Sequence, residues 1–200
     1  YTYTSLPYTD AKTCGQGPMN AAPQITVGTT NSMANAGDKA VFVTPGPDPT
    51  GGVNVTRTTP NNPSSSHGFR LGRNSSSPAT VTSMQKYFIA GEVFVFDFSM
   101  ILQNPTGHDY EEMPFGQVNL YDQNNNLIRT RCIVSDVNDC IFNTPSSTFY
   151  TDWSCMKLNT FEYQGQPLRA EFYIADCQLA GHYGYLYIDD IYVGNDSDDL

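Results

Sequence analysis

The sequence has few charged residues, and few of these are basic. Only 15% of its 200 residues are charged, with 10 Lys and Arg against 20 Asp and Glu, so the formal net charge is -10. The basic residues are scattered and form no stripe, so the phosphate backbone of a nucleic acid is not an expected partner. An acidic surface of this kind suits neutral ligands or cations.

Long apolar runs and helix-forming stretches are also missing. No run approaches the ~18 apolar residues of a membrane-spanning helix, and good helix formers never cluster over three turns. Asn, Ser, Thr, Gly, Pro and Tyr are abundant instead, a mixture that suits strands joined by many turns. The composition therefore predicts an all-β protein, and it is typical of extracellular β proteins.

Five cysteines are present, and none forms a Cys-x-x-Cys pair. Disulfides in an oxidising compartment are therefore a better interpretation than a metal knuckle. Spacing favours a Cys132–Cys140 bond, which would close a hairpin-sized loop, while the connectivity stays open. The odd number leaves one thiol unpaired or bonded outside the chain. The disulfide candidates are Cys132, Cys140, Cys155 and Cys177.

Alternation with a period of two predicts a series of short strands. In EVFVFDFSMILQ (92–103), Phe94, Phe96 and Phe98 alternate with residues that are also apolar up to Val95, as in a central strand covered on both faces. Strands spaced about 10–15 residues apart, without helical patterns or repeats, predict a jelly-roll β-sandwich of two antiparallel sheets. The other predicted strands cover 25–29, 39–44, 68–72, 115–122, 126–134, 167–175 and 182–193.

We expect residues 1–200 to form a single domain. Residues 1–24 are turn-rich and predict an extended N-terminal segment along the outside of that domain. Residues 45–67 are crowded with Pro, Gly, Asn, Ser and Thr, and predict a long loop region. A loop of this length in a compact domain is often functional.

Tyrosines and aliphatic residues alternate in HYGYLYIDDIYV (182–193). The aliphatic set is the expected core side, and the tyrosine set lies against a second layer or opens to solvent. Rings with polar edges suit stacking on sugars or peptides, whereas ordinary sandwich packing also explains such aromatics. The tryptophan in the polar stretch YTDWSC could likewise stack on a ligand, or it could simply attach a loop to the sheet. The candidate ligand-binding residues are Tyr183, Tyr185, Tyr187 and Trp153.

Two adjacent carboxylates, Asp189 and Asp190, follow the tyrosines. Adjacent residues of a strand point to opposite faces, so the two do not form a simple dyad. One of them could bind Ca²⁺ together with loop carbonyls and an N-terminal carboxylate, because hard cations prefer oxygen ligands. A strand-end carboxylate capped by backbone N–H groups is the equal alternative.

Two histidines, His108 and His182, each follow a glycine. With Asp176 or Glu112 they could form a zinc site. No short histidine spacing supports this, so we interpret His108, His182 and Asp176 as structural groups that fix loops.

An acidic loop, HDYEEMPF, contains Asp109, Glu111 and Glu112. A glycosidase needs two carboxyl groups about 5–10 Å apart, but a solvated acidic loop is the preferred interpretation. No serine or cysteine lies in a nucleophile motif. We therefore predict no catalytic residues and no enzymatic activity.

The run from Phe69 to Asp189 resembles a jelly-roll module of large secreted and surface proteins of the Bacteroidetes, including gliding and adhesion proteins. Its pieces include FRLGRNSSSPATVTSMQKYF, a Pro-x-Gly-His loop and the ending DCQLAGHYGYLYIDD. More distantly, the layout is similar to MAM and carbohydrate-binding jelly rolls, in which a strand aspartate binds calcium structurally. The resemblance implies a non-catalytic adhesion or binding module, exported by type IX secretion and displayed outside the cell. Its matched residues are Pro105, Gly107, His108, Pro114, Phe115, Asp176, Cys177, Gly181, His182, Tyr183, Gly184, Tyr185, Tyr187, Ile188 and Asp189.

The functional prediction is an extracellular, non-catalytic adhesion or ligand-binding module of a cell-surface or secreted protein. One alternative is a carbohydrate-binding module of a secreted hydrolase, and another is a structural protomer of a surface filament. The expected partners are a glycan or a surface protein, with possible self-association or other domains of a larger protein. Structural Ca²⁺ is the expected cofactor.

Overall fold

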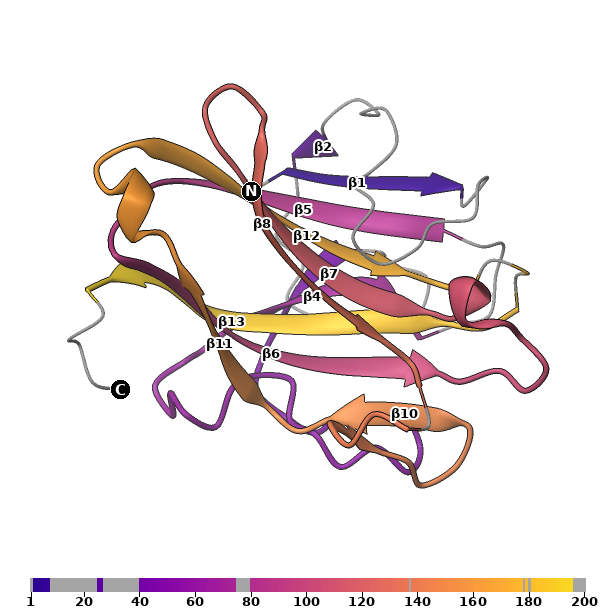
Figure 1. Ribbon diagram of the computed structural model, residues 1–200. Helices are drawn as coiled ribbons and strands as arrows, with labels where there is room; N and C mark the ends of the chain where they lie inside the picture. The colour runs from indigo at the N-terminus through magenta and orange to yellow at the C-terminus, as the bar shows by residue number, and fades with distance from the viewer. Residues whose placement is uncertain are drawn as a thin grey trace.

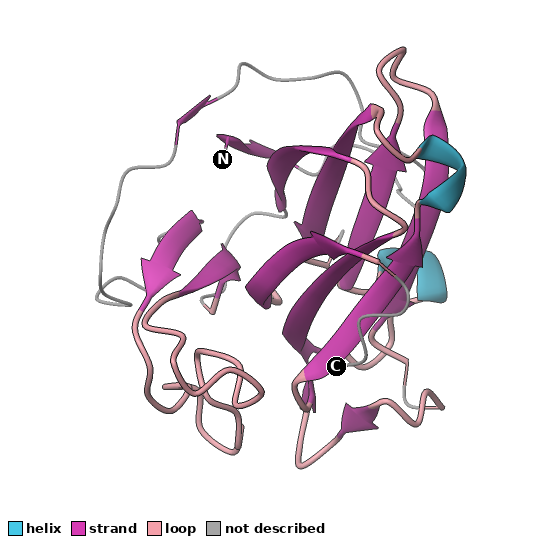
Figure 2. Cartoon of the chain, turned by 90° about the vertical axis from the view of Figure 1, so that its left-hand side faces the viewer, coloured by secondary structure: helices cyan, strands magenta, loops and turns pink. Residues whose placement is uncertain are grey.

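The computed structural model describes residues 2–7, 25–26, 40–74, 80–136, 138–177, 179 and 181–195. Within these ranges the chain consists of strands and loops, and its helical parts are two short 3-10 turns, η1 (Tyr110–Glu112) and η2 (Phe161–Tyr163) (Figure 2). No helix in this part of the chain has the length and hydropathy needed to cross a bilayer.

The strands form two antiparallel sheets that pack as a sandwich, which confirms the predicted fold class. Figure 1 shows the two layers, one containing β1, β5, β12 and β7 and the other containing β13, β6 and β10. The six-stranded sheet has the order β2 (Ile25–Thr26), β1 (Thr2–Pro7), β5 (Thr80–Ile89), β12 (Pro167–Ala175), β7 (Phe115–Tyr121) and β8 (Leu127–Val134). The seven-stranded sheet has the order β3 (Ala40–Val43), β4 (Gly68–Arg73), β13 (Gly184–Gly194), β6 (Val93–Gln103), β10 (Thr148–Thr151) and β9 (Phe142–Asn143), and β11 (Ser154–Asn159) also pairs with β6.

The last two strands of the sequence lie inside the two sheets. Strand β12 pairs with β5 on one side and with β7 on the other. Strand β13 pairs with β4 and β6 in the same way. Each sheet therefore joins strands that are distant in the sequence through a strand that comes at the end of the chain.

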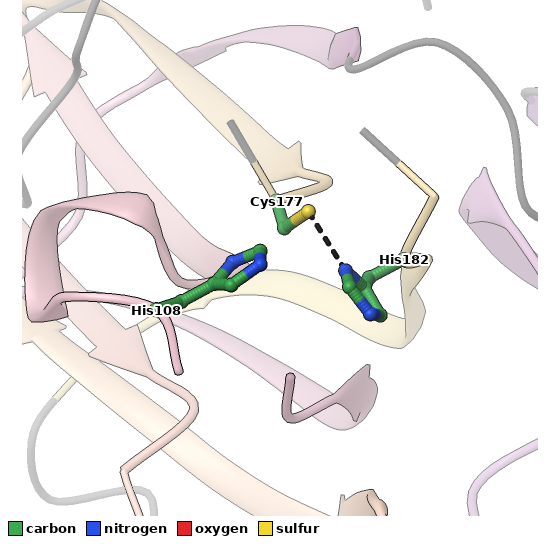
Figure 3. A group of neighbouring side chains, drawn as sticks. All are labelled: His108, Cys177 and His182. Atoms are coloured by element: carbon green, nitrogen blue, oxygen red, sulfur yellow. Dashed lines mark hydrogen bonds between the residues drawn. The ribbon is translucent and has the colours of Figure 1, made fainter. Parts of the chain in front are cut away.

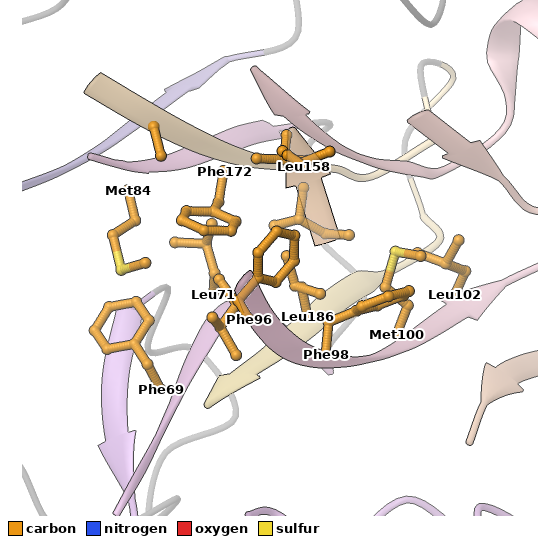
Figure 4. Close-up of a cluster of buried hydrophobic side chains, with 14 of the residues drawn as sticks. Phe69, Leu71, Met84, Phe96, Phe98, Met100, Leu102, Leu158, Phe172 and Leu186 are labelled. Carbon is orange, nitrogen blue, oxygen red and sulfur yellow. The ribbon is translucent and has the colours of Figure 1, made fainter. Parts of the chain in front are cut away.

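The hydrophobic core lies between the two sheets (Figure 4). Phe96 of β6 and Phe172 of β12 meet edge to face across the core, with their ring centroids 4.9 Å apart. Burying a side chain of this size contributes roughly 1.5–3 kcal/mol. Leu186 and Ile188 of β13 belong to the same cluster, so the aliphatic set of the last strand faces the core as predicted.

Most predicted strands match the structure to within one or two residues at each end. Strand β6 is buried along almost its whole length, as expected for a strand covered on both faces. The sequence patterns did not predict β5, because polar residues interrupt its alternation in TVTSMQKYFI. The predicted run 25–29 is described only at Ile25–Thr26.

Residues 45–67 form the predicted long loop between β3 and β4. Its backbone carries one isolated bridge, between Pro47 and Thr56. Of the predicted N-terminal segment 1–24, the structure describes only β1, and the rest lies outside the described residues.

Candidate functional site

The tyrosine row of β13 is covered by the loop 45–67. Tyr185 and Tyr187 have no exposed surface, and their hydroxyls donate hydrogen bonds to the two carboxylate oxygens of Asp48, at 2.9 and 2.7 Å. Asp48 also accepts a hydrogen bond from the backbone N–H of Thr50 at 2.7 Å. Burial, and then the charge of Asp48, raises the pKa of both tyrosines, so the hydroxyls stay protonated and act as donors.

The prediction that Tyr185 and Tyr187 form a stacking platform is therefore corrected, because buried rings offer no face to a ligand. Trp153 stacks on Tyr187 at 6.3 Å between centroids, and its Nε1–H donates to the carbonyl oxygen of Thr56 at 2.8 Å. This contact matches the alternative in which Trp153 attaches a loop to the sheet. Tyr183 is half-buried, and contact of Tyr183 or Trp153 with a ligand stays a prediction.

The carboxylate of Asp189 also fastens the loop 45–67. It is buried opposite Asp97 of β6, and its oxygens accept hydrogen bonds from the backbone N–H of Thr59 and the hydroxyl of Ser65, each at 3.0 Å. Asp190 is exposed, has a left-handed φ of 49°, and lies where the pairing of β13 with β6 shifts register. The geometry shown is that of a carboxylate capped by protein donors, and Ca²⁺ at Asp189 or Asp190 stays a prediction.

The outer side of the six-stranded sheet carries a second set of polar and aromatic side chains, which we call the polar face. Alternate residues of β12, including Phe172, point into the core, so the residues between them point outward. Pairing with β5 and β7 aligns these outward residues across three adjacent strands. The three rows, each given in the order β5, β12 and β7, are Tyr87–Arg169–Tyr121, Gln85–Glu171–Asn119 and Ser83–Tyr173–Gln117.

Hydrogen bonds and ion pairing hold the first two rows in place. Glu171 accepts hydrogen bonds from Arg169 Nη1 at 2.6 Å and from Gln85 Nε2 at 2.9 Å, so both of its carboxylate oxygens are used. The guanidinium carbon of Arg169 lies 4.2 Å from the ring centroid of Tyr121, a cation–π contact. Charge-assisted contacts of this kind fix the side chains before any ligand arrives.

The third row contains a hydroxyl that lacks a hydrogen bond. Gln117 Nε2 donates to Asn119 Oδ1 at 2.8 Å, and Asn119 Nδ2 donates to the Tyr121 hydroxyl at 3.1 Å. The Tyr173 hydroxyl beside them is buried and has no hydrogen-bond partner in the described part of the chain. Burial, and then the nearby Glu171 carboxylate, raises its pKa, so it stays protonated. An unpartnered buried hydroxyl costs about 1–3 kcal/mol.

Exposure decreases along the polar face. Tyr87 is 63% exposed, Gln85 and Arg169 are partly buried, and Asn119 and Tyr173 are buried. The accessible part of the face is therefore the end that carries Tyr87.

Sequence reasoning predicted strands at 115–122 and 167–175 but did not identify their outward residues as a site. The available signal was the set of outward-pointing residues in each strand. These are long hydrogen-bonding and aromatic side chains, whereas small polar side chains are sufficient for a solvated surface. The missing information was the pairing of these two strands with the unpredicted β5.

A second constellation brings together His108, Cys177 and His182 (Figure 3). One potential ligand atom from each residue lies within 4.8 Å of the other two. Cys177 Sγ and His182 Nδ1 are 3.0 Å apart, and the two imidazole rings are 5.0 Å apart between centroids. Burial, and then the neighbouring His108, lowers the pKa of His182, so its imidazole is neutral at neutral pH.

The partners weighed for the histidines in the sequence, Asp176 and Glu112, do not belong to this group among the described residues. The carboxylate of Asp176 accepts a hydrogen bond from the backbone N–H of Gly184 at 3.1 Å and lies 3.7 Å from Arg73 Nη2. Asp176 therefore contacts the start of β13, and its predicted role in fixing the loop stays a prediction. Glu112 accepts a hydrogen bond from the backbone N–H of Asp109 at 3.0 Å, a contact within the predicted acidic loop.

The predicted Cys132–Cys140 disulfide is wrong, because Cys140 is a thiol, as are Cys155 and Cys177. Cys140 lies in the turn after β8 and is exposed, as is Cys155. Three of the four disulfide candidates are thus thiols, and Cys177 instead meets the two histidines.

No protein-family model matches the chain, and no curated protein matches it. Solved structures with a similar fold include TmCBM61 in complex with beta-1,4-galactotriose, at 14% identity and a TM-score of 0.36 over 65% of this chain and 71% of that one. CBM28, a non-crystalline cellulose specific carbohydrate-binding module, is 16% identical with a TM-score of 0.38, over 66% of this chain and 78% of its own. Tailspike protein 4 of bacteriophage CBA120 is 11% identical with a TM-score of 0.37, over 79% of this chain and 20% of its own. These likenesses concern the β-sandwich fold alone, and the resemblance to Bacteroidetes surface modules stays a prediction.

Proposed function

We propose that this chain is a non-catalytic module that binds a glycan on the polar face of its six-stranded sheet. The observation that carries the proposal is the alignment of three tyrosines with amide, carboxylate and guanidinium groups over three adjacent strands. Sugars present apolar C–H surfaces beside hydroxyls that both donate and accept hydrogen bonds. Aromatic rings flanked by planar hydrogen-bonding groups match both properties.

The accessible end of the polar face supports a polar ligand. Tyr87 is 63% exposed, and its hydroxyl donates a hydrogen bond to Gln85 Oε1 at 3.3 Å. Gln85 and Arg169 beside it are partly buried. An exposed ring flanked by an amide and a guanidinium presents both an apolar face and hydrogen-bonding groups to a ligand.

The charges of the face favour a neutral ligand. The carboxylate of Glu171 and the guanidinium of Arg169 pair with each other, so the two formal charges cancel. The chain as a whole carries a net charge of -10, which repels anionic polymers. Neutral oligosaccharides are therefore the preferred class over acidic ones.

Among the functions predicted from the sequence, the polar face supports a carbohydrate-binding module more than a protein adhesin or a filament protomer. We also propose that the chain is extracellular, either attached to a secreted hydrolase or acting in adhesion at a cell surface. Fractionation of the native organism, with detection of the chain in the medium and on intact cells, tests the location.

The binding proposal is tested with a neutral glycan array, followed by calorimetric titration of the best ligand. We expect Tyr87→Ala to weaken binding at least tenfold, about 1.4 kcal/mol, because it removes the accessible ring. Gln85→Ala should also weaken binding, because it removes the partly buried amide beside that ring. Tyr110→Ala is the matched control, since Tyr110 is an exposed tyrosine on η1, away from the polar face.

An array without hits overturns the proposal, as does a ligand whose affinity is unchanged by Tyr87→Ala and Gln85→Ala. A ligand lost on Tyr110→Ala places the site elsewhere on the surface.

A further inference from the structure

We propose that His108, Cys177 and His182 bind one zinc ion at the end of the sandwich opposite Tyr87. The site is separate from the accessible end of the polar face, which carries Tyr87 and Arg169. Arg169 and Cys177 are eight positions apart on and just after β12, which corresponds to about 25 Å of extended chain. The zinc proposal therefore stands or falls independently of glycan binding.

The fold brings the three residues together from two loops that connect the two sheets. His108 lies in the loop between β6 and β7, and Cys177 and His182 lie in the connection between β12 and β13 (Figure 3). Each histidine follows a glycine with a left-handed backbone, Gly107 at φ 81° and Gly181 at φ 90°. Only glycine adopts this conformation without strain, so in both loops a turn precedes the imidazole and directs it toward the thiol.

The distances are close to those of a tetrahedral zinc centre. Zinc binds sulfur at about 2.3 Å and imidazole nitrogen at about 2.0–2.1 Å, which places sulfur and nitrogen about 3.6 Å apart and two nitrogens about 3.3 Å apart. The potential ligand atoms of the cluster lie within 4.8 Å of one another, and Cys177 Sγ and His182 Nδ1 are 3.0 Å apart. Shifts of roughly 1 Å or less in each side chain bring all three to bonding positions around one ion.

A buried ring nitrogen points to an absent ligand as well. His108 Nδ1 is enclosed and has no hydrogen-bond partner within the described residues. An unsatisfied buried nitrogen is costly, and a metal ion that accepts its lone pair removes this cost. The nitrogen therefore gives an observation independent of the clustering itself.

The donor set selects the metal. One thiolate and two imidazoles suit zinc, whereas calcium and magnesium require oxygen ligands. On binding, Cys177 loses its thiol proton to solvent and its sulfur donates an electron pair to the ion. The cluster supplies three ligands from the described residues, which leaves the fourth tetrahedral position to water or to an external donor.

The test uses the full chain, purified, stripped with a chelator and titrated with Zn²⁺ and with Co²⁺ as a spectroscopic probe. We expect one equivalent of either ion to bind, and Co²⁺ to show the visible bands of a tetrahedral site with a thiolate-to-cobalt charge-transfer band. Cys177→Ser should remove the charge-transfer band, and His108→Ala should weaken binding at least tenfold. Zn²⁺ should raise the melting temperature of the wild-type chain and not that of the variants, because binding to the folded state alone stabilises it.

Two controls separate a built site from metal uptake by any surface thiol or imidazole. His67→Ala and Cys140→Ser remove an exposed histidine and an exposed thiol outside the cluster, and both should bind one equivalent as the wild type does. His108 is only partly buried, so His108→Ala still tests the site if replacing the fully buried Cys177 prevents folding.

The proposal is overturned if the wild-type chain takes up no stoichiometric metal, or if the charge-transfer band persists in Cys177→Ser. The proposal is also overturned if His67→Ala or Cys140→Ser reduces metal uptake as much as His108→Ala does.

Discussion

Replacing Asp48 should weaken the attachment of the loop 45–67 to the seven-stranded sheet. The carboxylate of Asp48 accepts hydrogen bonds from Tyr185, from Tyr187 and from the backbone of Thr50. Asp48→Ala therefore removes the acceptor of two tyrosine hydroxyls on rings with no exposed surface, while Thr50 Oγ1, 2.6 Å from the Tyr185 hydroxyl, remains as an acceptor for Tyr185. Losing the acceptor of a buried donor costs about 1–3 kcal/mol where nothing replaces it, and losing an ordinary hydrogen bond costs about 1 kcal/mol, so we expect a loss of about 2–4 kcal/mol of unfolding free energy.

The tyrosines provide the means to separate this effect from general damage. The Tyr185→Phe/Tyr187→Phe double variant removes both hydroxyls. When Asp48→Ala is added to this variant, no tyrosine hydroxyl loses its acceptor. In that background the cost of Asp48→Ala should fall to about 1–2 kcal/mol, because only the bond from Thr50 is lost. The difference between the two backgrounds measures the coupling.

Urea unfolding followed by fluorescence gives the free energies, and Asp152→Ala, at an exposed aspartate, should change them by less than about 0.5 kcal/mol. Equal costs of Asp48→Ala in the wild-type and double-phenylalanine backgrounds would refute the reasoning. A cost below about 1 kcal/mol in the wild type would do so too, because the hydrogen bonds to the tyrosines would then contribute little.

Three further predictions concern other parts of the fold. A bound Ca²⁺ would offset the repulsion between the facing carboxylates of Asp97 and Asp189. We therefore expect Ca²⁺ to raise the melting temperature, and either EDTA or Asp189→Asn to abolish this increase. A melting temperature that Ca²⁺ leaves unchanged contradicts the prediction. Partial desolvation, and then the charge of Asp97, raises the pKa of the Cys155 thiol above its ordinary value. Its alkylation rate should therefore increase through a midpoint at higher pH than that of a free cysteine, and an equal or lower midpoint contradicts the assignment. Gly72 has a φ of 85°, and a Cβ added there meets the backbone of β13, so Gly72→Ala should lower the unfolding free energy by more than the left-handed strain of about 1–3 kcal/mol. Gly165 has a φ of 79° but lies in open space, so Gly165→Ala should cost only that strain. Equal losses of unfolding free energy in urea would contradict the predicted clash.

The strands could be predicted where a single strand contains the whole signal. The alternation of phenylalanines in 92–103 marks β6, and the run 167–175 coincides with β12. Strand β5 was missed because Ser83, Gln85 and Lys86 hide its alternation, and its position beside β12 depends on pairing between residues far apart in the sequence.

The two candidate sites could be predicted only in part, for the same reason. The polar face requires three strands to be neighbours, and no local pattern records which strands pair. At the histidine cluster, the sequence offered Asp176 and Cys177 side by side. The turn after β12 directs Asp176 to Gly184 and Cys177 to His182, and a turn of this kind is set by tertiary contacts.

The position of β12 and β13 inside the sheets affects how the chain acquires its structure during synthesis. Residues 167–175 join β5 to β7, and residues 184–194 join β4 to β6. Until these two segments leave the ribosome, each layer is divided into halves whose unpaired strand edges are open to other chains. Both sheets are therefore expected to close only once residues 167–194 have been synthesised, and a premature stop before Pro167 should yield an insoluble product instead of a smaller stable one.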